Sequence, residues 1–408
     1  MTNEIKNVPE LRFPEFNEQW EIKKLADLGY YGKNYSFSRA SEGVGDIRHV
    51  HYGDIHSKLP TKINDENLLP TIVENKNFEF VECGDIIFAD ASEDYKDLGK
   101  TVLVDILDSK IIAGLHTYLF KVNKGSASEF LINVTKTQNY RKFIKQRGTG
   151  ISVLGISKTN LASFSLYVPS YREQKKIGSF FSKLDRQIEL EEQKLEKLEE
   201  QKKGYMQQIF SQQLRFKDED GSNYLDWSIK ELKEILTPGN KEKIEDKSIY
   251  NRLTVGLHGK GVFHLEQERK TKDTRPFYQR YEGELIIGKQ NFFNGSIAII
   301  PKEFNGYICS NAIMSYKFKD NINSKYVLEY LLQNDFLRKN EFLADGTGQK
   351  ELSEKNFEVL KINIPNSTEE QQKIGDFFKK IDELIETQSS KVELLKGRKQ
   401  GFLQKMFI

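Results

Sequence analysis

The chain has 408 residues, of which 30% are charged and 38% hydrophobic, and its formal net charge is +2. This length allows two or three domains with cores of their own, and the near-neutral charge neither implies nor excludes a nucleic-acid partner. Two distant cysteines and the lack of an apolar signal segment or of any apolar run of about 18 residues predict a cytoplasmic protein, with no disulfide framework, zinc-cysteine site or membrane span.

Residues 1–168 are expected to form a first globular domain of mixed α/β structure. It ends in a short strand at residues 164–168, where apolar and polar residues alternate before Pro169. Period-two patterning that ends at proline is typical of a half-buried strand leading into a turn. The Gly-Thr-Gly tripeptide at residues 148–150 is too short for a cofactor loop, so we expect it to turn the chain into this strand.

One long helix is predicted from Ser170 to Phe210. Ser170 and Glu173 form a capping-box pattern, and the apolar residues then recur at alternating steps of four and three. This is a heptad seam that faces one partner helix, interrupted by polar Glu191 and Lys202. A helix of about 40 residues is about 60 Å long. The predicted seam residues are Ile177, Phe181, Leu184, Ile188, Leu195 and Leu198.

The same elements then recur in the second half of the chain. Gly-Thr-Gly returns at residues 346–348, followed by an alternating strand, a proline and a second helix from Ser367 to Phe407. Each seam residue lies 197 positions after its counterpart, and Gln388 and Lys399 repeat the polar interruptions. The second seam consists of Ile374, Phe378, Ile381, Ile385, Val392 and Leu395.

Shorter similarities extend this duplication into the globular parts. The sequence CGDIIFA at Cys83–Ala89 resembles EGELIIG at Glu282–Gly288, and the segments that contain Trp20 and Trp227 also match. The two tryptophans could be core residues or part of a docking surface. Residues from about 30 to 80 do not align with those from about 237 to 280. The two halves therefore share a framework and are expected to differ in function in these segments.

The predicted fold is α+β, with two mixed α/β domains separated by two long helices that form an antiparallel coiled coil. Two copies pack most simply about a pseudo-twofold axis, because each surface then meets its own copy. The expected boundaries are 1–168 for the first domain, 169–212 for the first helix, 213–365 for the second domain and 366–408 for the second helix.

Catalytic patterns are weak in this sequence. It has no phosphate-binding glycine loop, no HExxH and no Ser/His/Asp signature. Asp85 with Asp94-Tyr95-Lys96 is the nearest nuclease-like pattern, and His49, His51 and His56 are the nearest metal-like cluster. Such spacings arise freely when 30% of the residues are charged, so no catalytic, cofactor-binding or metal-binding residue is predicted.

Basic residues interleaved with aromatics and amides occur in the divergent segments of both domains. Cations neutralise phosphates, and Arg, Asn, Gln and His can hydrogen-bond to base edges. A solvated polar face with aromatics in the core is the alternative interpretation of each single residue. The DNA-binding candidates of the first domain are Tyr31, Lys33, Tyr35, Arg39, Arg48, His49, His51, Arg141, Lys145 and Arg147. Those of the second are Arg252, His258, Lys260, Arg269, Lys270, Lys272, Lys289, Gln290 and Asn291.

Longer motifs carry a family resemblance. The pattern P-S-x-x-E-Q-x-K-I-G-x-F-F-x-K-[LI]-D occupies Pro169–Asp185 and, with one extra residue, Pro365–Asp382. The same family resemblance extends to three further segments. They are the helix end at Lys202–Phe210, more loosely the helix end at Arg398–Phe407, and the sequence R-F-P-E-F at Arg12–Phe16. On these residues nearly the whole chain resembles the specificity subunit of a type I restriction–modification system.

This resemblance implies a non-catalytic subunit that reads a bipartite, asymmetric site in double-stranded DNA. Each domain would read one half-site, while the helices would set the spacer and dock two methyltransferase subunits. Restriction and translocase subunits would join the complex, and S-adenosylmethionine, ATP and Mg²⁺ would bind only to partner subunits. The alternatives are a coiled-coil scaffold that binds only protein, and an enzyme in which recognition and cleavage are fused.

Overall fold

A computed structural model describes residues 7–74, 76–266, 274–344 and 351–408. The chain divides into two compact units, which are described separately. Unit 1 comprises residues 1–192 together with 390–408, and unit 2 comprises residues 193–389. None of the helices in the described residues is both long and apolar enough to cross a membrane.

Unit 1 is built on a five-stranded sheet with the strand order β2-β10-β6-β8-β4. β6 is buried at every residue, as expected for an uninterrupted apolar run that is covered on both faces. A smaller sheet has the order β5-β3-β9, and a two-stranded ribbon joins β1 to β12. The strands are β1 (Glu21–Lys24), β2 (Gly29–Tyr31), β3 (Glu42–Val50), β4 (Lys62–Ile63), β5 (Thr71–Ile72), β6 (Ile86–Ala89), β7 (Ala91–Ser92), β8 (Thr101–Val104), β9 (Ile111–Ala113), β10 (Thr117–Val122), β11 (Leu154–Gly155) and β12 (Ser165–Val168).

Short helices cover this sheet and lead into the first long helix. The short helices are α1 (Leu25–Leu28), α2 (Tyr52–Ser57), α3 (Ser128–Val134), α4 (Gln138–Arg147) and α5 (Lys158–Ala162), and the long helix is α6 (Tyr171–Phe210). Trp20 is buried in the core of this unit, where its ring packs edge-on against Phe130. Met406 and Phe407, from the end of the second long helix, lie in the same core.

Unit 2 repeats this plan with a four-stranded sheet in the order β14-β21-β18-β19. Its two-stranded ribbon, β13 with β22, corresponds to β1 with β12. The strands are β13 (Ser228–Glu231), β14 (Leu236–Pro238), β15 (Leu253–Val255), β16 (Val262–His264), β17 (Phe277–Gln279), β18 (Leu285–Gly288), β19 (Ile297–Ile299), β20 (Ile308–Ser310), β21 (Ile313–Phe318) and β22 (Lys361–Ile364). The helices are α7 (Leu232–Ile235), the 3₁₀ segment η3 (Lys289–Asn294), α8 (Ser324–Leu331), α9 (Asn334–Asn340), α10 (Glu354–Glu358) and α11 (Thr368–Lys405).

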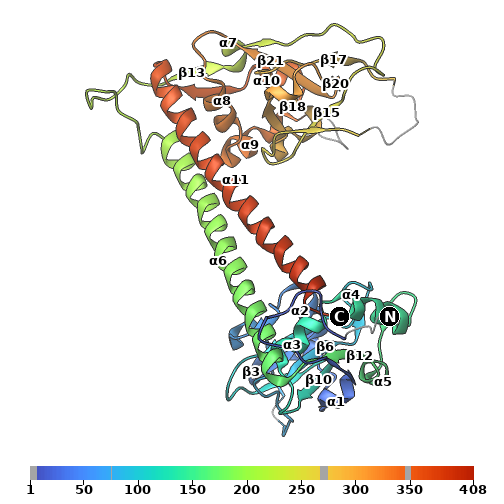
Figure 1. Cartoon of the computed structure of the whole chain (residues 1–408). Helices are drawn as coiled ribbons and strands as arrows, with labels where there is room; N and C mark the ends of the chain where they lie inside the picture. The colour runs from blue at the N-terminus through green and yellow to red at the C-terminus, as the bar shows by residue number, and fades with distance from the viewer. Residues whose placement is uncertain (1–6, 75, 267–273, 345–350) are drawn as a thin grey trace. The chain divides into compact units, whose positions relative to one another are not determined.

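The helices α6 and α11 pair antiparallel within each unit (Figure 1). In unit 1, Asp185 forms an ion pair with Lys399, and Glu191, further along α6, pairs at 3.0 Å with Lys391, which precedes Lys399 on α11. In unit 2, Lys202 pairs with Asp382 at 2.7 Å. All twelve predicted seam residues are buried or half-buried, whereas Leu190, Leu384 and Leu394, which lie off the seam, are exposed.

These ion pairs are reciprocal. Lys202 and Lys399 are counterparts in the duplication, and so are Asp185 and Asp382. Lysine from one helix therefore meets aspartate from the other in both units, as a pseudo-twofold axis requires. Three of the four polar residues that interrupt the seam, Glu191, Lys202 and Lys399, thus hold the pairing through charge. The predicted fold, with its duplication and antiparallel helix pair, is confirmed.

The helix starts differ from the predicted capping boxes. Glu173 gives both carboxylate oxygens to Arg12, at 2.7 and 2.8 Å, and Glu370 binds Arg215 and the indole of Trp227. Only Ser367 keeps the serine half of the box, accepting from the backbone of Glu370 at 3.4 Å. An arginine offers such a carboxylate two parallel hydrogen bonds and a full opposite charge, whereas the capping box offers it one backbone amide, so the distant arginines take these carboxylates.

Candidate nucleic-acid interface

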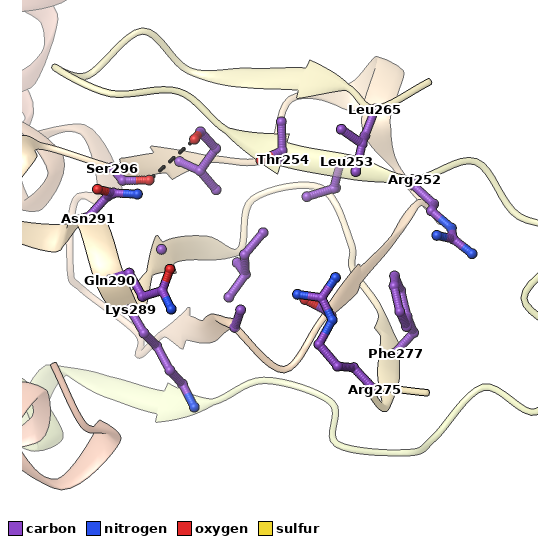
Figure 2. Close-up of a pocket in the computed structure, with 15 residues that line it drawn as sticks. Arg252, Leu253, Thr254, Leu265, Arg275, Phe277, Lys289, Gln290, Asn291 and Ser296 are labelled. Carbon is purple, nitrogen blue, oxygen red and sulfur yellow. Dashed lines mark hydrogen bonds between the residues drawn. The ribbon is translucent and has the colours of Figure 1, made fainter. Parts of the chain in front are cut away.

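A basic pocket lies in the second domain at the end of the central strand β18. It has a volume of about 210 Å³ and is lined from β15, β17, η3 and β20. Figure 2 shows Lys289, Gln290 and Asn291 on one side of it and Arg252 and Arg275 on the other. Among the residues that the structure describes, no acidic side chain lines this pocket. Its lining therefore offers an incoming ligand mainly hydrogen-bond donors and positive charge.

Arg252 is held in this pocket by an aromatic ring. Its guanidinium lies 4.7 Å from the centroid of Phe277, a distance at which a cation is attracted to the ring face. The Arg252 Nε atom is buried and has no hydrogen-bond partner within the described residues. An unsatisfied donor of this kind is costly unless a ligand or water fills the site.

The backbone fixes Lys289 at the rim of the pocket. Its amide donates to the carbonyl of Ala312, and its carbonyl accepts from the amide of Leu352. The side chain is 3.8 Å from Glu354, at the start of α10. Ser296 closes the floor by donating to the carbonyl of Val255 at 3.3 Å, the bond dashed in Figure 2.

The first domain has an open groove of about 380 Å³ next to the end of its central strand β6. Asp90 lies there, with one carboxylate oxygen 3.2 Å from Nδ1 of His116 and a hydrogen bond from Tyr118. The ammonium of Lys158 is 5.1 Å from the centroid of the Tyr118 ring. Burial raises the pKa of Asp90, while His116, Tyr118 and Lys158 partly oppose this rise. Burial and then Asp90 raise the pKa of Tyr118 to about 12, so its hydroxyl remains a donor.

Several predicted residues of the first domain have intramolecular partners. Arg39 pairs with Asp54 and Glu42, and Arg48 bonds to the carbonyl of Leu69 and to Asn67. His49 is fully buried beside Glu42, and burial lowers its pKa. His51 caps α2 by accepting from the amide of Gly53. Arg141 donates to the carbonyls of Thr135, Lys96 and Leu98.

The other candidates of this domain lie closer to solvent. Lys33, Lys145 and Arg147 are exposed. Tyr31 packs edge-on against Tyr118, which places it beside the Asp90 groove. Tyr35 accepts from the backbone of Glu79 and packs within a small aromatic cluster.

In the second domain, four of the predicted residues meet at the basic pocket, namely Arg252, Lys289, Gln290 and Asn291. His258 and Lys260 are exposed in the turn after β15, where the amide of His258 donates to the carbonyl of Asn294. Arg269, Lys270 and Lys272 lie outside the described residues, as does the second Gly-Thr-Gly.

The structure also places the residues of the weaker nuclease-like and metal-like sequence patterns. Asp85 is buried, accepts from the backbone of Glu82 and pairs with Lys121 at 3.4 Å. Within the part of the chain that the structure describes, no group of three His, Cys, Asp or Glu side chains is placed to hold a metal ion.

Sequence reasoning missed Asp90, His116 and Tyr118 as groove residues. The signal was present, because the similarity of CGDIIFA to EGELIIG places Asp90 opposite Lys289, directly after the shared strand. Asp90 is acidic, so it falls outside the pattern of basic residues and aromatics that marks the other candidates.

Comparison with known proteins decides the family. The family model described as type I restriction modification DNA specificity domain matches twice, at residues 17–200 and 224–395. The chain belongs to this family. The expected specificity subunit with two recognition domains is thereby confirmed.

Individual relatives agree with this specificity-domain assignment. The chain is 25% identical over 422 residues to the putative type I restriction enzyme MjaX specificity subunit of Methanocaldococcus jannaschii, covering 98% of this chain and 95% of the relative. It is 24% identical over 278 residues to the MjaVIII specificity subunit of the same organism, covering 64% of this chain and 65% of the relative. These relatives are specificity subunits, which disfavours a fused recognition and cleavage enzyme.

Solved structures share the fold of this specificity subunit. The S subunit of a type I restriction–modification system from M. genitalium superposes with a TM-score of 0.60 at 14% identity, covering 98% of this chain and 99% of that one. A chain from a study of complex assembly and conformational transition of the type I system gives 0.54 at 15% identity, covering 95% and 97%.

Proposed function

We propose that this specificity subunit is non-catalytic and that each of its domains reads one half of a bipartite, asymmetric DNA site. The observation that carries the proposal is the pocket of Arg252, Lys289, Gln290 and Asn291. Arginine and lysine recognise guanine O6 and N7, and glutamine and asparagine recognise adenine, so this set suits base edges in the major groove. The other basic residues of the divergent segments suit the DNA phosphates on either side of those bases.

Catalysis belongs, in this proposal, to other subunits. Two methyltransferase subunits would bind S-adenosylmethionine, and restriction and translocase subunits would bind ATP and Mg²⁺, so this chain itself would hold no cofactor. The complex would act on double-stranded DNA in the cytoplasm. A scaffold that binds only protein would leave the basic pocket without a ligand.

The docking surface for the methyltransferase subunits is proposed to lie on features that both copies keep. Ile22 and Ile229 hold equivalent places on the ribbon strands β1 and β13, and they are 62% and 69% exposed. Gly204 and Gly401 are equivalent positions within the long helices, and a Cβ at either would meet no atom within 4 Å. Because both halves of the chain carry the same surface, each half would bind one of two identical methyltransferase subunits.

The long helices are proposed to set the number of unread base pairs between the half-sites. Both helices contribute residues to both units, so their length is shared by the two readers. A change of helix length would then alter the spacer and leave the half-sites as they are.

The pocket can be tested by substituting its cations. Arg252→Ala or Lys289→Ala should weaken recognition of one base pair in one half-site by about 1–3 kcal/mol, because a side chain that reads a base is lost. The readout is a map of methylated bases in DNA from cells that carry the variant with its methyltransferase.

Lys302→Ala is the matched control, because Lys302 is an exposed lysine of the same domain outside the pocket. The control should leave both half-sites unchanged. Two pocket variants that fold and keep the original methylation pattern would show that this pocket does not read DNA.

A further inference from the structure

The Asp90 groove of the first domain and the basic pocket of the second domain occupy the same place in the duplicated fold. The amide of Asp90 donates to the carbonyl of His116, and the amide of Lys289 donates to that of Ala312. The carbonyl of Asp90 accepts from Ile156, and that of Lys289 accepts from Leu352. Each residue directly follows the central strand, β6 or β18, so the backbone places Asp90 and Lys289 at equivalent points.

The charges at this place are reversed between the domains. Asp90 has Lys158 nearby, from the first turn of α5, and the two charges interact. Lys289 has Glu354 nearby, from the first turn of α10. Ser157 and Ser353 cap these helices in the same way, each accepting from the third amide. The framework is therefore retained, while the acid and the base have exchanged positions.

The remaining lining also differs between the two sites. The first groove adds His116 and Tyr118, both of which turn toward the carboxylate of Asp90. The second pocket adds the donors of Arg252 and the amides of Gln290 and Asn291. His116 has a left-handed backbone, with φ of 53°, which is uncommon for a residue other than glycine and which accumulates at functional sites.

A carboxylate limits what the first groove can recognise. Phosphate oxygens would repel Asp90, so it is suited to the bases and not to the DNA backbone. Its oxygens only accept hydrogen bonds, and four acceptor positions leave room beyond His116 and Tyr118. In the major groove the base donors are the exocyclic amino groups of cytosine and adenine.

We infer that the two grooves read opposite chemistry, with Asp90 accepting from an amino-bearing base of one half-site and Lys289 donating to a guanine of the other. This inference rests on the proposed function and adds the base class that each domain selects. Asp90 and Lys289 are the specificity-determining residues at equivalent positions, and His116 and Tyr118 position the Asp90 carboxylate.

The test is Asp90→Ala in the full chain, with methylated bases mapped in cells that also carry its methyltransferase. Alanine removes both acceptor oxygens, whereas asparagine would still recognise adenine. One base pair of the first half-site should lose about 10-fold in discrimination, because the amino group of its cytosine or adenine loses its acceptor. The second half-site should stay unchanged. Asp46→Ala is the control, since Asp46 is an exposed aspartate of the same domain outside the groove.

Three outcomes separate the inference from the proposed function. A folded Asp90→Ala variant with an unaltered first half-site overturns the inference. A parent chain that directs no methylation to any bipartite site overturns the proposed function itself. If Asp90→Ala melts early, His116→Asn must relax one base pair of the first half-site and none of the second, and no change there is equally decisive against the inference.

Discussion

Lys136 is a lysine of unit 1 whose positive charge is destabilised by its surroundings. It lies between α3 and α4 and shares Asp185 with Lys399, its ammonium 3.7 Å from the carboxylate. Burial and then the charge of Lys399 lower the pKa of Lys136 to about 8. Leu332 stands at the matching position of unit 2, one residue before the N-cap of the next helix. The second copy therefore has no lysine at this position, and the second cation on its equivalent aspartate, Asp382, is Lys325 of α8 at 3.1 Å.

Replacing Lys136 by leucine should stabilise unit 1 at pH 7 by about 1 kcal/mol, because a buried charge is removed while Asp185 keeps Lys399. An unfolded lysine has a pKa of about 10.4, so the unfolded state binds more protons above pH 8. The stability of the parent chain should thus rise from about pH 8 towards about pH 10, and the advantage of Lys136→Leu should shrink. Urea unfolding at pH 7 and pH 9 measures both effects. A variant less stable than the parent at pH 7 would contradict this account.

At this scale the sequence predicts residue types better than residue partners. Glu173 and Glu370 were correctly recognised as matching residues of the two helix starts. Their arginine partners could not be foreseen, because Arg12 lies 161 positions away from Glu173 and Arg215 lies 155 from Glu370. The same holds for Arg39 and Arg48, whose local basic pattern gave no sign of Asp54 or Leu69.

Four of the five glycines in the long helices form two matching pairs of different kinds. A Cβ on Gly178 would lie 2.6 Å from Cβ of Glu129, and one on Gly375 would lie 2.6 Å from Oδ1 of Asn323. These two glycines let the helices pack closely against the starts of α3 and α8. Gly204 and Gly401 have open space around them, so packing within this chain does not require them.

Alanine substitution should separate the two kinds. Gly178→Ala should cost about 1–3 kcal/mol through overpacking, whereas Gly204→Ala with Gly401→Ala should gain about 0.5–1 kcal/mol each from helix propensity. If a methyltransferase subunit approaches these helices closely, the stabilised variant should also bind it more weakly. Thermal unfolding and co-purification with the methyltransferase measure the two effects.

Gly397→Ala is the matched control for this experiment. Gly397 also has open space around it on α11, but its counterpart on α6 is Glu200. It should gain the same stability and keep partner binding. Equal binding by all of these alanine variants would exclude the glycine positions from the docking surface.

Element prediction succeeded where period and duplication agreed. The first long helix was expected at residues 170–210 and spans Tyr171–Phe210, and the strand expected at 164–168 spans Ser165–Val168. Single residues of the basic pocket were predicted, but which residues meet at each site could not be, since each site is assembled from loops distant in sequence, such as Asp90 with His116 and Ile156. A sheet register, and not a local pattern, brings these residues together.

The segment before each globular domain makes the same backbone contact with the end of a long helix in both units. After α6, the amide of Leu214 donates to the carbonyl of Gln208. In unit 1 the amide of Leu11 donates to the carbonyl of Lys405, which is the counterpart of Gln208. The segment that precedes the first domain thus follows α11 in the way that the segment before the second domain follows α6.

A fragment that ends near Leu214 should therefore pair with itself and direct methylation to a palindrome. Lys202 of one copy would meet Asp185 of the other, and Phe210 would take the place of Phe407 against Phe130. Analytical ultracentrifugation should give the mass of a dimer, and methylated-base mapping should show two identical half-sites.

Asp185→Lys in the same fragment is the control, because it opposes two lysines across the helix pair and should weaken the dimer. A fragment that is monomeric at all concentrations would argue against the pseudo-twofold pairing of the helices.

The division of the chain into its two units also sets the order in which they can be completed on the ribosome. The first unit contains the residues translated first, yet Met406 and Phe407 of its core are translated last. Its apolar interior stays open throughout the synthesis of residues 193–389, all of which belong to the second unit. The later half of the message therefore encodes the unit that can finish folding first, and a premature stop codon near residue 390 would damage the N-terminal domain.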